Sequence, residues 1–245
     1  MVRSVLGIDV GGSSIKGGLV DIDAGLLQWE LASVATPRPA APEPVMQAVA
    51  NLASSMFLTQ AAGAAFPSVV QGGKARTAAH IDPSWIDIDG VALATRRLGR
   101  RAVFLTDADA AGLAEMCWGA GRGLKGVVIM LTLGTGIGTA LLSDGNLFSN
   151  TELGRLELNG IDAEEWASAR IRTQLGLGSS AWIERVNVCL KRMQTLFWPD
   201  AFILGGAVSE RFEEFAPHLH SPAQIRPAHF AAQAGVIGAA LAAAS

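Results

Sequence analysis

Several stretches of this sequence combine glycines, hydroxyl side chains and single acids in a way that suits phosphate chemistry. The first covers residues 6–21, where Asp9, Gly11, Gly12 and Ser13 stand between two apolar runs. Glycines let the backbone approach an anion, and hydroxyl and backbone N–H groups donate to phosphate oxygens. A carboxylate in an apolar strand is costly unless it is paired or bound to a metal. The stretch predicts a phosphate-binding hairpin with a metal near Asp9, although an ordinary glycine turn after an edge strand has the same pattern.

The same pattern returns in the second half of the chain. Residues 127–142 again form an apolar run, a glycine turn at Gly134–Gly136 and a second apolar run. A further glycine pair, Gly205–Gly206, follows a short apolar strand. Such a repeat indicates two related halves that each present a phosphate-binding turn. Neither turn matches a P-loop, because no Gly-Lys-Ser/Thr follows, and neither leads from a strand into a helix as a dinucleotide-binding turn does.

Asp107 is a second candidate for chemistry, because it stands between a short apolar strand, 102–105, and a helical segment, 110–118. Ligands of open α/β sheets gather outside the carboxyl ends of strands. There Asp107 could act as a general base that takes a proton from a substrate hydroxyl. An acid before an Ala-rich helix more often caps it, but Asp109 is better placed for capping, which leaves Asp107 for chemistry.

Two further acids could bind sugar hydroxyls. Glu152 lies in a polar loop and Glu164 begins a helical segment. Carboxylates accept hydrogen bonds from several hydroxyls at once, although a solvated or helix-starting acid is the simpler interpretation of each. His218, His220 and His229 lack the spacing of metal ligands and are assigned no role.

Strands alternate with helices along the chain, which predicts an α/β fold. We expect a continuous strand over 26–36, a helix over 43–56, a helix over 163–173 and an Ala-rich helix from 231 to the end. With 245 residues, of which half are apolar, the chain can form one large domain or two small ones.

The composition argues against several classes of protein. The net charge of -3 disfavours a surface for nucleic acid or for a basic membrane patch. The two cysteines, Cys117 and Cys189, form no CxxC pair and fit a reducing cytoplasm. No signal segment is seen, and no apolar run approaches the roughly 20 residues of a spanning helix. We expect a cytoplasmic protein without nucleic-acid or membrane partners.

The ordered set of motifs resembles the ROK family of sugar kinases. The motifs cover nearly the whole chain and are Asp9–Lys16, Thr106–Glu115, Leu133–Gly138, Asn150–Gly154 and Ile203–Gly206. Within the family, the likeness is to the branch of bacterial polyphosphate glucokinases. Thr77–Trp85 and Trp198–Asp200 are similar to stretches of that branch.

The resemblance implies an actin-like, ribonuclease-H-like fold with two α/β lobes around a central cleft. The N-terminal lobe would hold residues 1–108 and the last helix, about 231–245, and the C-terminal lobe residues 109–230. The implied reaction is phosphoryl transfer from ATP or polyphosphate to the 6-hydroxyl of glucose or a related hexose. Mg²⁺ would be held through the donor phosphates. Family likeness also suggests a homodimer.

The resemblance assigns roles to individual residues, with Asp107 as the catalytic base. The positions that match phosphate or nucleotide binding are Asp9, Gly11, Gly12, Ser13, Lys16, Gly134, Thr135, Gly136, Gly205 and Gly206. The positions on the sugar side are Ser68, Thr106, Glu152, Arg155 and Glu164.

Three positions depart from the family pattern. The family usually has Asn, His and Gly where this chain has Thr106, Arg155 and Ser68. All three are on the sugar side, whereas Asp107 and both glycine turns are intact. We therefore expect an active hexokinase-like enzyme with an altered acceptor, for which Arg155 could favour an anionic sugar. A sugar-binding protein with weak or no kinase activity is the alternative. A sugar-responsive regulator is disfavoured, because no helix-turn-helix segment precedes Val5.

Overall fold

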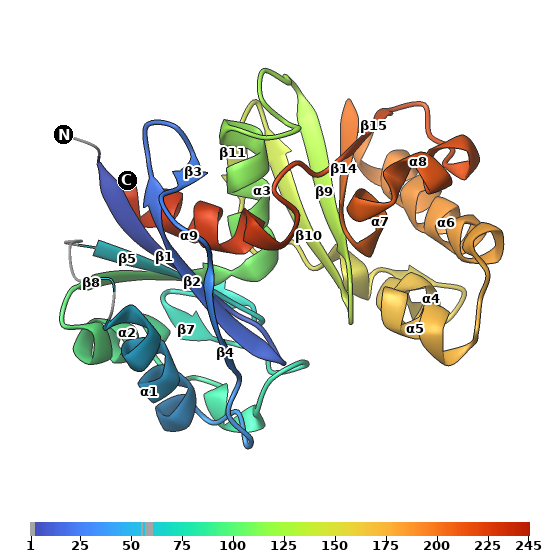
Figure 1. Ribbon diagram of the computed structural model, residues 1–245. Helices are drawn as coiled ribbons and strands as arrows, with labels where there is room; N and C mark the ends of the chain where they lie inside the picture. Colours follow the sequence, from blue (N-terminus) through green and yellow to red (C-terminus); the bar gives the residue numbers. More distant parts are fainter. Residues whose placement is uncertain (1–2, 55, 57–60) are drawn as a thin grey trace. The chain divides into compact units, whose positions relative to one another are not determined.

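The structure is a computed structural model that describes residues 3–54, 56 and 61–245. The chain folds into two compact units, each built on one sheet. Unit 1 comprises residues 1–114 and 233–245, and unit 2 comprises residues 115–232. Figure 1 colours unit 1 from blue to green, with the C-terminal helix in red, and unit 2 from green to orange-red. The central cleft expected between two lobes stays a prediction.

Unit 1 contains a six-stranded mixed sheet in the order β3-β2-β1-β5-β8, with β4 also on β2. The strands are β1 (Ser4–Val10), β2 (Ser14–Asp21), β3 (Leu26–Leu27), β4 (Ala32–Ala35), β5 (Ala61–Phe66) and β8 (Arg101–Thr106). The first two strands form the predicted antiparallel hairpin, whereas β1, β5 and β8 run parallel. A separate two-stranded ribbon is made by β6 (Val70–Gln71) and β7 (Lys74–Ala75).

The prediction of one continuous strand over residues 26–36 is wrong, because β3 and β4 are separate strands. Val20 pairs with Leu27, whereas Gly17 pairs with Ala32, so the register on β2 advances by two residues between β3 and β4. Residues 28–31 therefore leave the sheet between the two pairings.

Helices cover the sheet of unit 1. They are α1 (Pro42–Ala53), α2 (Gly90–Leu98), α3 (Asp107–Cys117) and α9 (Ala234–Ala244), with a 3₁₀ turn at Pro83–Trp85. Proline at the start of α1 suits a position whose N–H has no helical partner. On the α1 and α2 side the core contains the rings of Phe66, Trp85 and Phe104, whose neighbouring centroids lie 4.3 and 4.7 Å apart.

Helix α9 lies directly against the sheet of unit 1, next to β1 and β5 (Figure 1). A Cβ added at Gly7 would lie 1.9 Å from the carbonyl oxygen of Val236, and one at Gly63 would lie 1.8 Å from that of Ala239. Only glycine leaves room for such close contact between a strand and a helix backbone. The end of the chain is thereby fixed to the strand that carries Asp9.

Unit 2 contains a five-stranded sheet in the order β11-β10-β9-β14-β15. Its strands are β9 (Val127–Leu133), β10 (Ile137–Ser143), β11 (Asn146–Phe148), β14 (Ala201–Gly206) and β15 (Gln224–Pro227), with a small hairpin of β12 (Glu157–Leu158) and β13 (Ile161–Asp162). The second predicted hairpin is confirmed, because β9 and β10 pair antiparallel. Its helices are α4 (Ala163–Ala167), α5 (Ala169–Gln174), α6 (Ser179–Phe197), α7 (Ala207–Glu210) and α8 (Phe212–Phe215).

The single helix expected over residues 163–173 is two helices. Ser168 has an extended backbone with ψ 157, which ends α4, and its side chain accepts a hydrogen bond from the N–H of Ile171 to cap α5. Because the break follows Glu164 by only four residues, that acid stands on a short helix of its own.

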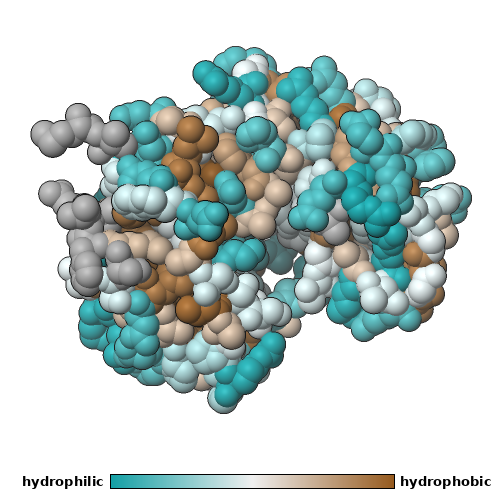
Figure 2. Space-filling view, viewed as in Figure 1, coloured by the Kyte–Doolittle hydropathy of each residue, from teal (hydrophilic) through white to brown (hydrophobic). Residues whose placement is uncertain are grey.

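None of the helices among the described residues is both long enough and apolar enough to cross a bilayer. In the view of Figure 2, hydrophobic areas are small and are interrupted by hydrophilic ones.

Candidate active site

The carboxyl ends of three parallel strands bring the predicted residues of unit 1 together. Asp9 on β1 is level with Ala65 on β5, and Phe66 is level with Thr106 on β8. Ser68 and Asp107 follow these strands directly. The register therefore places Asp9, Ser68 and Asp107 at the same edge of one sheet.

The glycine turn between β1 and β2 is held by the segment that follows β4. Within the turn, the N–H of Gly11 donates to the carbonyl of Ser14 at 2.9 Å. The Thr36 hydroxyl donates to the carbonyl of Gly11 at 2.6 Å, and Arg38 donates to the carbonyl of Gly12 at 3.1 Å. The carbonyls of Gly11, Gly12 and Ser14 thus all accept hydrogen bonds.

Asp9, on the strand before this turn, is an acid whose ionised form is disfavoured. Burial raises its pKa above the usual value, and the charge of Lys16, its cross-strand neighbour, opposes that rise. A Cβ added at Gly235 would lie 2.8 Å from the carboxyl carbon of Asp9, so the first turn of α9 reaches this side chain. The half-buried acid of the predicted hairpin thus faces the charge of Lys16 within the hairpin and contacts a helix more than 200 residues away in sequence.

Asp107 occupies the first turn of α3, where its carboxylate accepts the N–H of Ala108 at 2.7 Å and faces the Thr106 hydroxyl at 3.4 Å. Burial and the neighbouring charge of Asp9 raise its pKa to about 6, while these hydrogen bonds and the charge of His80 lower it. A carboxylate with a pKa near 6 is still ionised at neutral pH and accepts a proton more readily than an ordinary Asp.

The two sugar-side departures in unit 1 have local roles. Ser68 is buried, its hydroxyl donates to the carbonyl of Val69 at 2.9 Å, and its oxygen accepts the N–H of Thr77 at 3.2 Å. Ser68 thus ties the end of β5 to the loop that leads to His80. Thr106 is buried and directs its hydroxyl towards Asp107.

The second glycine turn, in unit 2, is exposed at Gly134 and Thr135 and is held by α5. The N–H of Gly134 donates to the carbonyl of Gly136 at 3.0 Å. Arg170 donates from its backbone to the carbonyl of Gly134 and from its side chain to that of Thr135, both at 3.3 Å. An arginine therefore contacts each of the two glycine turns through carbonyl oxygens.

The glycine pair at the end of β14 lies next to this second turn. β14 pairs parallel with β9, and Gly206 is level with Leu133, the residue before the turn. Gly206 has a φ of 78, and a Cβ there would lie 2.4 Å from the carbonyl oxygen of Leu133. Both glycine sites of unit 2 therefore share one edge of its sheet.

Glu164, Asp162 and Arg155 form an ionic cluster in unit 2. One Arg155 nitrogen lies 3.1 Å from a carboxylate oxygen of Glu164 and 3.1 Å from one of Asp162. Glu164 is buried and also accepts the N–H of Ile137, the first residue after the second turn, at 3.3 Å. The hydrogen bond to Asp162 and the charges of Glu164, Asp162 and Glu152 raise the pKa of Arg155. With Glu152 as a charged neighbour, one cation thus stands among three acids.

Glu152 stands in an exposed position just before the 3₁₀ turn Leu153–Arg155. The loop is fixed to β10, because the Thr139 hydroxyl donates to the carbonyl of Thr151 and accepts the N–H of Leu153 at 3.0 Å. The structure therefore brings Glu152, Arg155 and Glu164 together.

Sequence reasoning missed Thr36, Arg38, His80, Arg170 and Gly235. Four of them act through backbone groups or close packing, for which the residue type carries no signal. His80 is different, because it lies in the stretch Thr77–Trp85 that resembles the polyphosphate glucokinase branch.

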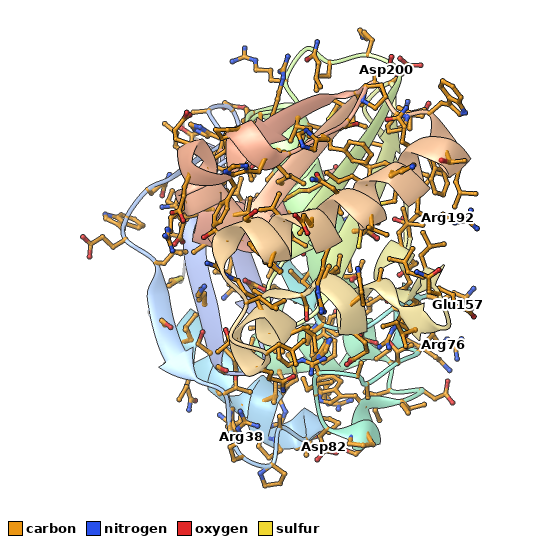
Figure 3. The ribbon with its side chains drawn as sticks, turned by 90° about the vertical axis from the view of Figure 1, so that its right-hand side faces the viewer. Arg38, Arg76, Asp82, Glu157, Arg192 and Asp200 are labelled. Atoms are coloured by element: carbon orange, nitrogen blue, oxygen red, sulfur yellow. The ribbon has the colours of Figure 1, made fainter. Side chains whose placement is uncertain are left out.

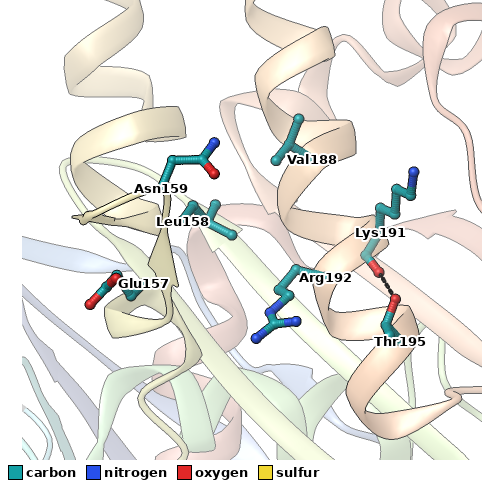
Figure 4. Close-up of a pocket in the computed structure, with 7 residues that line it drawn as sticks. All are labelled: Glu157, Leu158, Asn159, Val188, Lys191, Arg192 and Thr195. Atoms are coloured by element: carbon teal, nitrogen blue, oxygen red, sulfur yellow. Dashed lines mark hydrogen bonds between the residues drawn. The ribbon is translucent and has the colours of Figure 1, made fainter.

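A surface pocket in unit 2 includes none of the predicted residues. It lies between the β12–β13 hairpin and α6, and Figure 4 shows Asn159, Val188, Lys191 and Arg192 around it. Of its lining, only Leu158 is buried, so no charged group is enclosed there. Among the residues that the structure describes, no three His, Cys, Asp or Glu side chains form a group that could hold a metal.

Comparison with known proteins decides the family. The model of the ROK family matches residues 5–158, which include both hairpins, Asp107 and Glu152. The chain belongs to the ROK family. This confirms the family and, with the solved structures below, the two-sheet α/β fold expected from the motifs.

Relatives of this ROK chain include a polyphosphate glucokinase from Mycobacterium tuberculosis, 40% identical over 241 residues, which cover 98% of this chain and 91% of the relative. The fold of this ROK chain matches the crystal structure of an inorganic polyphosphate/ATP-glucomannokinase from Arthrobacter sp. strain KM, with 43% identity, a TM-score of 0.94 and 98% of each chain covered. A ROK family glucokinase from Streptomyces griseus, solved with glucose and AMPPNP, shares the fold at 24% identity and a TM-score of 0.86, over 98% of this chain and 99% of that one. The chain is thus a homologue of phosphotransferases with an alcohol acceptor.

Proposed function

We propose that this protein is a sugar kinase that transfers a phosphoryl group from polyphosphate or ATP to the 6-hydroxyl of glucose or a related hexose. The observation that carries the proposal is the position of Asp107, at the carboxyl end of β8 and at the same sheet edge as the first glycine turn. The 43% identity to a polyphosphate/ATP-glucomannokinase over the whole chain supports the same reaction.

In this proposal Asp107 takes the proton from the sugar hydroxyl as that oxygen attacks the donor phosphorus, and the displaced phosphate leaves with the bond electrons. The raised pKa of about 6 suits a base that works near neutral pH. The exposed Ser13 and the backbone N–H groups of the first turn, and Gly134 with Thr135 of the second, would bind and orient donor phosphates. Glu152 and the buried Glu164 would accept hydrogen bonds from sugar hydroxyls.

The residues of unit 1 fit a magnesium ion held mainly by the donor. Mg²⁺ in kinase sites usually takes one or two carboxylates, donor phosphates and water, so a cage of three protein ligands is not needed. Asp9, a half-buried carboxylate beside the glycine turn, is the residue placed to face such an ion. When bound, Mg²⁺ would neutralise charge on the donor phosphates.

The ionic cluster of unit 2 favours a neutral hexose over the anionic sugar that Arg155 alone suggested. The Arg155 charge is already shared by Asp162 and Glu164, with Glu152 adding a third negative charge. One positive and three negative charges leave the cluster net negative, which repels a sugar carboxylate or phosphate. Glucose and mannose are therefore expected as better acceptors than glucose 1-phosphate, an anionic sugar that keeps its 6-hydroxyl.

A coupled assay that detects only hexose 6-phosphates tests the proposal. Purified protein is given ATP or polyphosphate with Mg²⁺ and a panel of glucose, mannose, glucosamine and glucose 1-phosphate, and mass spectrometry identifies the phosphorylated product. We expect turnover with a neutral hexose that falls at least about 100-fold in Asp107→Asn, the size of a lost general base. If no sugar is phosphorylated with either donor while glucose binds in calorimetry, the protein is a sugar-binding member of the family instead. The predicted homodimer is checked by light scattering on the same sample.

A further inference from the structure

A cation lies against the first glycine turn, on a segment to which neither the motifs nor the comparisons assign a role. Arg38 follows β4 and donates from Nη2 to the carbonyl oxygen of Gly12 at 3.1 Å. Two residues earlier, the N–H of Thr36 donates to the carbonyl of Ser13 at 3.0 Å. The segment 36–38 therefore runs along the turn, and its arginine is held against Gly12.

The charge of Arg38 remains available. A guanidinium carries five N–H donors, and the bond to Gly12 uses one. The residue is exposed, and across the described residues no carboxylate lies within 4 Å of it as an ion-pair partner. Figure 3 shows Arg38 and Asp82 at the lower edge of the same view. Asp82 directs its carboxylate to its own neighbour Ser84, whose N–H it accepts at 2.9 Å.

Charges around the turn require such a cation if a polyanion is to bind. Asp9 and Asp107 are two acids at this sheet edge, and Lys16 on β2 supplies one positive charge. His80 also lies beside the turn, because its carbonyl oxygen would be 3.1 Å from a Cβ at Gly12, and its charge lowers the pKa of Asp107. Asp9 and Asp107 outnumber Lys16, and Arg38 adds a second positive charge at this edge of the sheet.

We propose that Arg38 binds a phosphate group of the phosphoryl donor at the first glycine turn. This inference rests on the proposed function, since it adds a cation to the site that would hold the donor. The planar fork of guanidinium N–H groups matches two oxygens of one phosphate, next to the exposed Ser13. The shared chemistry is a phosphate oxyanion, which ATP and polyphosphate both offer.

Direct binding measurements test this without requiring turnover. Calorimetry is done with AMPPNP and with polyphosphate of defined length, each with Mg²⁺, on wild type, Arg38→Ala and Arg38→Lys. The matched control is Arg96→Ala, which removes an exposed arginine of unit 1 whose nearest acid, Glu43, is 3.8 Å away. We expect Arg38→Ala to weaken donor binding about tenfold, which corresponds to about 1.4 kcal/mol. Arg38→Lys should recover part of the loss, and Arg96→Ala should change binding less than twofold.

The pattern across donors identifies the phosphate. Weaker binding of both donors by Arg38→Ala assigns Arg38 to a phosphate near the transferred group. Weaker binding of polyphosphate alone assigns it to a more distant phosphate of the longer chain. The losses should shrink as salt increases, because the contact is exposed to solvent.

Unchanged binding of both donors in Arg38→Ala would overturn the inference. So would a loss accompanied by a lower melting temperature and no recovery in Arg38→Lys, since Arg38 would then only brace the turn. A wild-type protein that binds donors but phosphorylates no sugar would refute the proposed function and leave the result for Arg38 standing.

Discussion

Replacing the proposed base should make the protein more stable while it removes activity. Asp107 carries a pKa raised from 3.8 to about 6 by burial and by the charge of Asp9. A raised pKa in an acid means that the folded state disfavours the ionised form. Asp107→Asn keeps an oxygen that can accept the N–H of Ala108 and removes the charge. The free energy of unfolding should therefore rise by the amount that the ionised carboxylate costs the folded state.

The size of the gain follows from the pKa. A shift from 3.8 to about 6 corresponds to about 3 kcal/mol at a pH above both values. Asp107 is only half-buried, which makes this an upper limit. It also lies in the first turn of α3, where its negative charge is favourable by about 0.3–1 kcal/mol. We expect Asp107→Asn to be more stable by about 1–2 kcal/mol at pH 7.5.

The pH dependence provides the decisive test. The cost is fully present above pH 6, decreases as the pH falls through the folded pKa, and is absent below 3.8, where the carboxyl is protonated in both states. Urea unfolding of wild type and variant, in metal-free buffer at pH 7.5 and at pH 4, should give a difference that largely disappears at the lower pH. Asp82→Asn is the opposite control: hydrogen bonds from Ser84 lower the Asp82 pKa, so this variant should not gain stability at pH 7.5. A variant of Asp107 that is no more stable at pH 7.5 than wild type would refute the reasoning.

Three other outcomes follow from the same structure. The kcat/KM for the sugar should fall about tenfold per pH unit below about 6, as Asp107 becomes protonated, and pH–rate profiles of the purified enzyme measure this. Gly63→Ala should destabilise the folded protein by about 1–3 kcal/mol or more, because its Cβ would lie 1.8 Å from the Ala239 carbonyl oxygen. Thermal melting measures this, with Gly178→Ala as the control, since a Cβ there has nothing within 4 Å. Glu115→Gln should cost about 1–3 kcal/mol in denaturant unfolding, because the buried carboxylate accepts three backbone N–H groups at 2.8 Å and an amide nitrogen cannot accept.

Features fixed by short stretches of sequence could be predicted without the structure. Both hairpins follow from apolar runs around glycines, and the strand that ends before Asp107 placed this acid at a sheet edge. One error occurred where strand pairing decides the structure. The strand expected over 26–36 failed because two separate pairings on β2 differ in register, and propensity contains no information about register.

Long-range electrostatics could not be predicted either. Arg155 alone suggested an anionic sugar, but Asp162 and Glu164 both pair with its charge and leave less of it for an anionic ligand. Asp162 and Glu164 follow it by seven and nine residues, and a turn and a hairpin bring them back. The sign of the field at a site depends on every charge that the fold returns to it, so one unusual residue does not determine specificity.

The opening hairpin itself depends on the far end of the chain. Asp9 can remain in a buried strand because Lys16 lies across the hairpin and because Gly235, at the start of α9, leaves space beside the carboxylate. Helix α9 reaches that position only because Gly7 and Gly63 allow it to lie against the sheet. The first glycine turn is therefore a local pattern in the sequence, but the acid beside it is accommodated by packing between the two ends of the chain.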